Sequence, residues 1–407
     1  MSNFSSFINI CLKRKYHIIL QLVIFLLTNG TDYIGRLTRD IWFIVSQLYP
    51  IKMSALNNGF MSGTVKLVLV GLGLVGRRHA DVIAKTKSAE LVAIVDPSKD
   101  AQNYARKKSL KAYHSLEDMF TEQCPDGIIL ATPTLMHSEQ AFYCIQRTCP
   151  VMIEKPIATS SQEALALVEK AESLDVPVLV GHHRRYNPII QRANKVITSG
   201  EIGKVRAVHA NCWFYKSDEY FDEAEWRKKR GAGPISVNLA HDIDLLRYFC
   251  GEIDFVQAQT AKSIRGFENE DVAGALLTFR NGAIGTISVS DSIVSPWSWE
   301  MTSKENPVYP PTSESCYFIG GSHGSLSIPD LTLWGQNSER DWWKPLEALS
   351  MDHEPADPLY NQIIHFIDVI KKEENPIVSG REGLFTLRVI EAIQKSALTQ
   401  QSVKVES

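Results

Sequence analysis

The sequence predicts an α/β protein in which a doubly wound parallel sheet is followed by a second α/β domain with strands of its own. Three observations support this fold class. A glycine-rich turn at 71–76 joins an apolar strand to a helix, and strands then alternate with helices as far as residue 156. Beyond residue 205, apolar and polar residues alternate along several segments, as they do in half-buried strands. A length of 407 residues also favours more than one domain.

The composition is that of an ordinary globular protein and excludes several classes. The chain is 44% hydrophobic and 22% charged, which is unlike disordered or collagen-like chains. Its net charge of -3 leaves no basic excess for a nucleic-acid partner. The 7 cysteines form no CxxC pair, so no metal site is expected and free thiols in a reducing, cytoplasmic setting are favoured.

The first 62 residues do not read like the rest. A basic stretch at 13–15 precedes an apolar run at 17–27, as in a signal peptide, but no small-residue cleavage site follows. The run is also shorter than the ~20 residues that cross a bilayer. We therefore expect 1–62 to be a poorly structured apolar extension, with the functional start at Met53 or Met61. An N-terminal membrane anchor or signal sequence is the minority alternative.

The folded part begins with a dinucleotide-binding pattern. The apolar, β-branched segment 65–70 predicts a buried parallel strand, and a helix follows the glycines. Glycines at these spacings allow a tight turn, close approach of the backbone to a pyrophosphate, and packing of helix against sheet. The helix N-terminus would present its amides to the phosphates. The residues expected to contact the dinucleotide here are Gly71, Gly73, Leu74, Val75 and Gly76.

An acidic residue follows the second predicted strand, 91–95. Asp96 lies 20 residues after Gly76, where a carboxylate would accept hydrogen bonds from a ribose hydroxyl. A carboxylate there would repel the 2′-phosphate of NADP, so the sequence favours NAD. The nearby Lys99 leaves NADP open.

The alternation continues through a helix at 115–120, a strand at 127–132, a helix at 138–146 and a strand at 151–153. In such sheets, ligands bind at the carboxyl ends of the strands. Segments that follow these strands should therefore face the cofactor. The cofactor contacts expected from them are Ala131, Thr132, His137, Glu154 and Lys155.

Several motifs together make the chain resemble the glucose–fructose oxidoreductase / inositol dehydrogenase / MocA family. They include a Gly-x-Gly-x-x-Gly-x-x-His-Ala opening and Glu-Lys-Pro after the fifth strand. The resemblance runs from Val65 to Val403. The segments that carry it are 71–80, 154–156, 181–188, 199–205, 226–233, 241–251 and 390–397.

The resemblance implies a domain organisation. It gives an NAD(P)-binding Rossmann domain at 63–182 and a substrate and oligomerisation domain at 183–380, built on an open, mostly antiparallel sheet. A C-terminal helix and tail at 381–407 would pack back on the first domain. Independent support for the second sheet comes from Asn281-Gly282, a strong hairpin signal between two strand-like segments.

Oxidation of a secondary alcohol needs a base for the hydroxyl proton and a cation or donor for the developing alkoxide. Lys155, at a strand end beside the cofactor cleft, suits the electrostatic role, and Glu154 could position it. In the family, the matching lysine contacts the substrate hydroxyl and the nicotinamide ribose. His241 is the expected catalytic acid or base, because its side chain titrates near neutral pH and the family has a matching histidine.

The chain departs from the family pattern four residues before His241, where Val237 replaces a frequent aspartate. Asn238 lies on nearly the same predicted helix face and could orient His241 or bind a substrate hydroxyl, so we count it among the catalytic candidates. An amide carries no charge, which puts a carboxylate-assisted relay in doubt. Asp242 is interpreted as structural.

The substrate-binding candidates are less certain in role. Arg184 and Tyr186 follow a strand end and could reach substrate. Trp226 could stack on a sugar or pack on the sheet, and Arg227 begins a basic run that favours a solvated loop over a phosphate patch. The expected substrate-binding residues are Arg184, Tyr186, Trp226, Arg227, Asn238 and His241.

These residues predict an NAD(P)-dependent oxidoreductase acting on a secondary alcohol of a cyclic polyol, a sugar or a related hydroxy compound. The partners expected are that small molecule and further copies of the chain, with neither nucleic acid nor a membrane. Two alternatives stay open. One is a cofactor-sensing regulator without catalysis, and the other is a lyase or hydrolase that cycles NAD internally.

Overall fold

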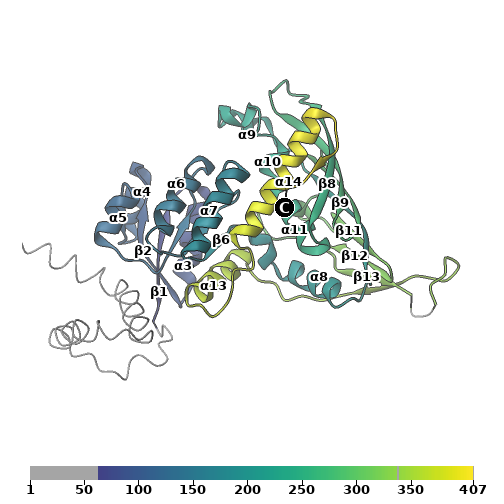
Figure 1. Ribbon diagram of the computed structural model, residues 1–407, viewed down its shortest axis with the longest axis horizontal. Coiled ribbons are helices and arrows are strands. Elements are labelled where there is room, and N and C mark those ends of the chain that lie inside the picture. Colours follow the sequence, from purple (N-terminus) through teal and green to yellow (C-terminus); the bar gives the residue numbers. More distant parts are fainter. Residues whose placement is uncertain (1–62, 337–338, 407) are drawn as a thin grey trace, which may run out of the picture.

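Two β-sheets organise the molecule, each with helices packed against it (Figure 1). The computed structural model describes residues 63–336 and 339–406. The predictions for 1–62, including a start at Met53 or Met61, lie outside the described residues. No helix in the described part of the chain is long and apolar enough to cross a membrane.

The first sheet is fully parallel, with strand order β3-β2-β1-β4-β5-β6. This confirms the doubly wound sheet. Its strands are buried apolar runs because helices cover both faces. The strands are β1 (Val65–Val70), β2 (Ala89–Val95), β3 (Lys111–Tyr113), β4 (Gly127–Leu130), β5 (Val151–Ile153) and β6 (Val178–Val180).

Helices connect these strands and begin where the sequence offers caps. The side chains of Ser98, Ser115 and Ser160 each accept a backbone N–H at a helix start, which satisfies a donor that the helix leaves open. The helices are α3 (Leu74–Lys85), α4 (Lys99–Lys107), α5 (Leu116–Glu122), α6 (His137–Ile145) and α7 (Ser161–Ser173), with a short 3₁₀ turn, η2 (Thr134–Met136).

Helix α13 (Pro358–Ile370) completes one face of the first sheet, although its residues fall in the range expected for the second domain. Phe366 and Ile370 are buried in one apolar cluster with strand β1. The fit is close, because a Cβ atom on Gly127 would come within 2.5 Å of the Ile370 side chain. The first domain is therefore built from two separate stretches of the chain.

The second sheet has nine strands in the order β14-β13-β12-β11-β7-β10-β9-β8-β15. Only β7 and β10 pair in parallel among these neighbours, which confirms a mostly antiparallel sheet. Gly282 has a φ of +85° in the turn between β9 and β10, as the hairpin signal predicted. The strands are β7 (Val205–Trp213), β8 (Ile253–Lys262), β9 (Glu270–Phe279), β10 (Ile284–Ser290), β11 (Tyr317–Gly321), β12 (Gly324–Ile328), β13 (Thr332–Gly335), β14 (Glu347–Ser350) and β15 (Val403–Lys404).

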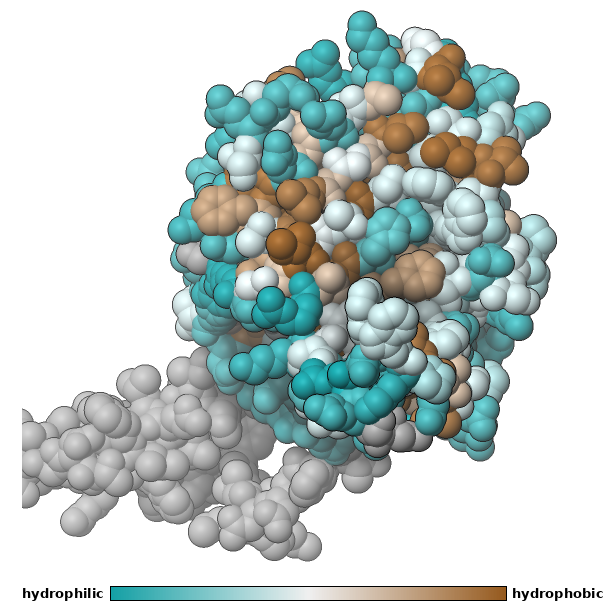
Figure 2. Space-filling view, turned by 90° about the vertical axis from the view of Figure 1, so that its right-hand side faces the viewer, coloured by the Kyte–Doolittle hydropathy of each residue, from teal (hydrophilic) through white to brown (hydrophobic). Residues whose placement is uncertain are grey.

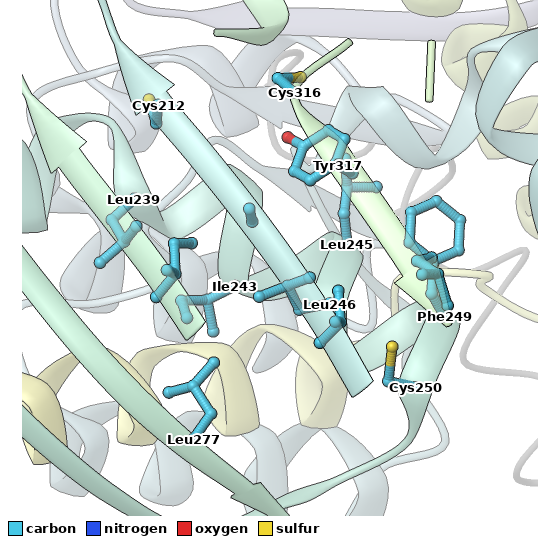
Figure 3. Close-up of a cluster of buried hydrophobic side chains, with 14 of the residues drawn as sticks. Cys212, Leu239, Ile243, Leu245, Leu246, Phe249, Cys250, Leu277, Cys316 and Tyr317 are labelled. Carbon is cyan, nitrogen blue, oxygen red and sulfur yellow. The ribbon is translucent and has the colours of Figure 1, made fainter. Parts of the chain in front are cut away.

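One face of this sheet is covered by helices and forms the second core. Helix α11 (Leu239–Cys250) is buried along almost its whole length and packs Ile243 and Leu246 toward Leu277 of β9 (Figure 3). The remaining helices of this domain are α8 (Pro188–Thr198), α9 (Asp218–Asp222), α10 (Pro234–Val237) and α12 (Trp299–Thr302), with 3₁₀ turns η3 (His183–Tyr186) and η4 (Glu225–Lys228).

The opposite face of the nine-stranded sheet is open, and apolar side chains gather on it (Figure 2). Leu276, Ile284, Phe318 and Trp334 are each about half exposed there, on strands β9 to β13. Leu276 and Phe318 each alternate with buried residues of the same strand.

Helix α14 (Gly380–Thr399) runs between the two sheets (Figure 1). It packs against α7 of the first domain and against β8 and α11 of the second. Glu391 accepts hydrogen bonds from the backbone N–H and the hydroxyl of Ser161, the first of them at 2.7 Å. The helix therefore contacts both domains. The sequence had predicted contact with the first domain.

Candidate active site

The glycine turn after β1 has the shape that a dinucleotide requires. Gly71 has a φ of +87°, and a Cβ atom there would lie 2.7 Å from the Ala131 carbonyl oxygen. A Cβ on Gly76 would lie 2.1 Å from the Gly71 carbonyl oxygen. By contrast, a Cβ on Gly73 would meet nothing within 4 Å, so the space beside Gly73 is open to a ligand.

The first turn of α3 faces that open space. Gly73 caps the helix without a side-chain hydrogen bond, and no acidic residue lies in the first turn. Leu74 is 82% exposed and Val75 is 41% exposed, so the first turn of α3 presents both side chains to solvent. The free amides and the dipole at this helix start would attract a pyrophosphate.

Asp96 lies directly after β2, beside the glycine turn. Its carboxylate accepts hydrogen bonds from the backbone N–H groups of Leu72 and Ser98, each at 2.8 Å. Partial burial alone would raise the pKa of Asp96, but the hydrogen bonds from Ser98 and Leu72 and the charge of Arg77 outweigh it and lower that pKa. Asp96 is thus an ionised carboxylate that is held beside the glycine turn.

The segments after β4 and β5 are joined by His137. One ring nitrogen of His137 lies 2.8 Å from the Pro156 carbonyl oxygen and the other lies 2.8 Å from the Thr132 carbonyl oxygen. The ring is buried and has no nitrogen left for a ligand, so the expected direct contact between His137 and the cofactor is corrected to a role in holding these two segments. Ala131 packs beside the glycine turn, and Thr132 donates a hydrogen bond from its hydroxyl to Gln140 at 2.7 Å.

Glu154 is engaged with protein groups rather than with the Lys155 ammonium. One oxygen lies 2.7 Å from Nε2 of the buried His79, and the other accepts the Lys155 backbone N–H at 3.2 Å. Burial opposes ionisation, but the hydrogen bond and charge of His79 outweigh it and lower the pKa of Glu154 to about 2. Glu154 therefore holds Lys155 through the backbone N–H of the lysine.

Lys155 reaches from the first domain to the second. It follows β5 and precedes a cis peptide bond to Pro156. Its ammonium donates to the carbonyl oxygen of Val237 at 3.3 Å, at the end of α10. Desolvation lowers the pKa of Lys155, and the charge of Glu154 opposes that change. The lysine stands between the cofactor edge of the first sheet and the start of α11.

His241 is the third residue of α11 and lies close to the contact between Lys155 and Val237. Its ring is 8% exposed and makes edge-on contacts with His182 and His183, with ring centroids 5.7 Å and 5.1 Å away. Burial and the charge of Lys155 lower the pKa of His241 well below 6.5, so the ring is a neutral imidazole near neutral pH. A neutral imidazole can accept a proton from a hydroxyl group.

Asn238 joins α10 to α11 and is held by a lysine that the sequence did not single out. The ammonium of Lys216 donates to Oδ1 of Asn238 at 2.8 Å, and it lies 3.6 Å from the Asp291 carboxylate. Lys216 is nearly buried, and desolvation lowers its pKa while Asp291 opposes that change. The Asn238 amide N–H₂ is thereby aimed away from Lys216 and remains a donor.

Arg184 and Tyr186 diverge although they share one 3₁₀ turn. Arg184 is buried and pairs with Asp242, 3.3 Å away, and with Glu300. Tyr186 points into the core of the first domain against His365, so the expectation that it binds substrate is corrected. In so tight a turn, successive side chains project in different directions.

Asp242 belongs to the same buried network as Arg184. It is fully buried, and it contacts the Tyr317 hydroxyl as well as Arg184. Burial raises its pKa to about 6, against the opposing charge of Arg184.

Trp226 and Arg227 lie on η4. Arg227 is the last residue in a series of contacts that runs from Asn238 through Lys216 and Tyr220. Arg227 lies over the Tyr220 ring at 4.1 Å, and Lys216 lies over the same ring at 4.9 Å. Trp226 is 58% exposed. Tyr220 therefore separates Arg227 from the Lys216–Asn238 pair, and neither η4 residue contacts Lys155 or His241 in the described structure.

Sequence reasoning missed His183, Lys216, Glu300 and Glu305. His183 lies inside a motif that was noted for its family resemblance, so its position beside the site could have been anticipated. The two glutamates come from a Pro-rich insertion, residues 295–311, that has no recognisable pattern, and only the fold brings them to η3. Among the described residues, no cluster of three or more His, Cys, Asp or Glu side chains has a metal-binding arrangement.

Comparison with protein-family models gives two matches. Residues 65–182 match the oxidoreductase family with an NAD-binding Rossmann fold, and residues 190–327 match the GFO/IDH/MocA C-terminal domain. Together these matches cover all six strands of the first sheet and, in the second sheet, strands β7 to β11 with most of β12.

Individual relatives have low sequence identity to this chain, but the similarity extends over most of both chains. The scyllo-inositol 2-dehydrogenase (NAD(+)) of Bacillus subtilis is 29% identical, over 81% of this chain and 93% of that enzyme. The myo-inositol 2-dehydrogenase of Thermotoga maritima is 23% identical, over 84% of this chain and 99% of that enzyme. The crystal structure of the WlbA dehydrogenase from Bordetella pertussis, in complex with NADH and UDP-GlcNAcA, is similar with a TM-score of 0.67 and 28% identity, covering 84% of this chain and 99% of that one.

Proposed function

The chain belongs to the Gfo/Idh/MocA family of NAD-binding oxidoreductases, and we propose that it transfers hydride between NAD and a secondary alcohol of a cyclic polyol, a sugar or a related hydroxy compound. The observation that carries the proposal is the 3.3 Å contact from the Lys155 ammonium to the Val237 carbonyl oxygen. It brings a cation from the cofactor edge of the first sheet beside the helix that holds His241.

The proposed roles follow from the chemistry of each group. Lys155 would stabilise negative charge on the substrate oxygen, because an ammonium in a partly buried site acts strongly on a developing alkoxide. His241 would accept the hydroxyl proton as a neutral imidazole, or return it in the direction of reduction. Asn238 would donate its amide to another substrate hydroxyl, since Lys216 fixes the opposite end of that amide.

The turn at Gly73, the start of α3 and Asp96 would hold the dinucleotide. When bound, NAD supplies the hydride acceptor. The ionised Asp96 supports the choice of NAD over NADP.

A screen of polyols, sugars and cyclic hydroxy acids with NAD⁺ or NADP⁺ tests the proposal, with NADH formation as the readout. Protein starting at Met61 and the full chain should be compared. Lys155→Ala and His241→Ala should each reduce turnover by roughly 10²-fold or more while NADH binding, followed by fluorescence, is retained. Turnover at the wild-type rate in both variants would exclude these roles.

The two alternatives have distinct signatures in the same screen. A lyase or hydrolase that cycles NAD would form product without net NADH. A cofactor-sensing regulator would bind NADH and show no turnover with any compound.

We also infer that the chain forms a homo-oligomer through the open face of its second sheet, in the cytoplasm. The exposed Leu276, Ile284 and Phe318 on that face support this inference (Figure 2). Light scattering of wild-type protein should give more than one chain per particle, and Phe318→Glu should shift the mass toward the monomer. A monomeric wild-type protein would contradict the inference.

A further inference from the structure

A proton accepted by His241 needs a path out of the protein. The ring is buried, and its Nδ1 atom has no hydrogen-bond partner among the described residues. The position where the family often has an aspartate holds Val237, whose carbonyl oxygen faces Lys155 instead. A group next to His241 must therefore carry the proton onward.

His183 lies beside His241 and extends toward the surface. The two ring centroids are 5.1 Å apart at an interplanar angle of 72°, and the His183 side chain is 19% exposed. An imidazole can accept a proton at one nitrogen and release it from the other. No hydrogen bond joins the two rings among the described residues, so the proton would pass between them through a bridging water. With that water in place, His183 has the chemistry of a relay.

Glu305 holds the outer nitrogen of His183. Its Oε1 atom lies 3.1 Å from Nε2 of His183, while Oε2 accepts from Asn187 at 2.8 Å and from the Trp299 indole at 3.1 Å. Burial opposes ionisation, but the hydrogen bond and charge of His183 outweigh it and lower the pKa of Glu305 to about 2. Glu305 is therefore an anchored carboxylate that fixes the orientation of the imidazole.

The Pro-rich insertion is locked onto the site at a second point. Glu300, on α12 of the same insertion, pairs with Arg184, the residue after His183. Two carboxylates of one insertion thus meet two consecutive residues of η3. This double attachment keeps Glu305 on His183 rather than in solvent.

Beyond Glu305 the route opens to the surface. Glu305 lines a surface cleft of about 520 Å³ together with Asn187, Lys304, Glu314 and Asp330. Glu305 is the member of the pair that meets this cleft, so a proton from the outer nitrogen of His183 reaches its water past the Glu305 carboxylate.

We propose that His183 and Glu305 form a proton relay that connects His241 to the solvent in this cleft, with His183 carrying the proton and Glu305 positioning it. This relay rests on the proposed dehydrogenase function. In oxidation, the hydride leaves the substrate carbon for NAD⁺ and the hydroxyl proton passes to His241, then to His183, and from its outer nitrogen to water. Reduction uses the same path in reverse, so each turnover of the alcohol releases or consumes one proton. The other charged or titratable groups near the two rings are His182, Arg184, Lys155 and Glu154.

Chemical rescue tests the relay on the full-length protein, with NAD⁺ and the polyol or sugar that gives the highest rate in the screen. We expect His183→Ala to lower kcat at least about tenfold in weakly buffered solution, and imidazole added to the buffer to restore most of that rate. Glu305→Gln should lower kcat as well, with its deficit shrinking as pH rises, because hydroxide can then accept the proton. Wild-type kcat should not depend on imidazole concentration.

Two control variants separate the relay from the stability of the insertion. Glu314→Gln removes a carboxylate from the same cleft without touching His183, and its kcat should match wild type. Trp299→Phe removes a neighbouring hydrogen bond to Glu305 and leaves the His183 contact, so imidazole should not increase its rate.

The outcomes distinguish failure of the relay from failure of the function. Normal kcat in His183→Ala, or a loss that imidazole does not restore, would exclude the relay while wild-type turnover keeps the dehydrogenase. If Lys155→Ala and His241→Ala turned over normally, or if the wild-type protein oxidised no compound, the proposed function would fail and the relay with it.

Discussion

The Lys155 ammonium and the Val237 carbonyl oxygen lie 3.3 Å apart and join the two domains at the candidate active site. Lys155 belongs to the carboxyl edge of the parallel sheet, and Val237 ends the short helix before His241. A valine side chain cannot form an ion pair with the lysine. The Lys155 ammonium is instead hydrogen-bonded to the neutral carbonyl oxygen of the main chain. This contact leaves the ammonium its full charge and two further N–H donors for a substrate oxygen.

Gly73 and Gly76 should respond differently to the same substitution. Gly76→Ala would place a Cβ 2.1 Å from the Gly71 carbonyl oxygen, so we expect a loss of several kcal/mol in the free energy of unfolding, of the order seen for overpacking. The Cβ of Gly73→Ala meets nothing within 4 Å, so this variant should lose at most about 1 kcal/mol, the cost of a poorer helix cap, while NADH binding weakens. Urea unfolding and a fluorescence titration measure the two effects. Equal loss of stability in both variants would contradict this assignment.

Asp96 should control affinity for NAD. Asp96→Asn removes the charge and keeps an oxygen for the Leu72 or Ser98 N–H. Loss of a hydrogen bond to a charged group costs about 1.5–3 kcal/mol, so KM for NAD⁺ should rise about tenfold or more. KM for NADP⁺ should fall, because the repulsion of its 2′-phosphate is gone. Steady-state kinetics with both cofactors decide this, and an unchanged preference would show that Asp96 does not select between them.

The pH dependence of oxidation should reflect the buried environment of His241. Burial and the charges of Lys155, Arg184, His183 and His182 lower its pKa, so the ring stays neutral and able to accept a proton at pH values where an exposed histidine is protonated. We therefore expect kcat/KM to stay level as pH falls through 6.5 and to decline only below it. A pH profile from about 8 to about 5 measures this. A midpoint at or above 6.5 would refute a neutral, buried base.

The Glu154–His79 pair should make stability sensitive to acid. The pKa of Glu154 falls from 4.5 to about 2 in the folded protein, so its contribution is present above pH 4.5 and is lost as pH falls toward 2. A shift of this size corresponds to a few kcal/mol at most. The difference in the free energy of unfolding between wild type and Glu154→Gln should shrink steadily below pH 4.5. Glu90→Gln, on the exposed side of β2, is the control, and a difference that does not depend on pH would contradict the prediction.

Much of the first domain could be predicted because local chemistry determines it. A buried apolar strand, Gly71 at a positive φ with Gly76 packed against its carbonyl oxygen, and an acid after the next strand mark the candidate cofactor site within one βαβ unit. The same holds for Lys155, which a strand end places beside the cleft.

What could not be predicted depends on contacts between distant residues. Glu305 meets His183 across 122 positions of sequence, and no periodic pattern marks the insertion that carries it. The opposite directions of Arg184 and Tyr186 arise from a 3₁₀ turn, whose side chains follow neither helix nor strand periodicity. The role of His137 likewise depended on two carbonyl oxygens that only the folded loops bring within reach.

The discontinuous first domain has a consequence for biosynthesis. Strand β6 ends at Val180, but α13 starts at Pro358 and α14 ends at Thr399, so the ribosome makes every strand from β7 to β14 before the first sheet receives its last helices. Until then, the faces of β1 and β6 that these helices cover stay exposed to water and to other nascent chains. The cofactor-binding half of the protein can mature only after the other half has been translated.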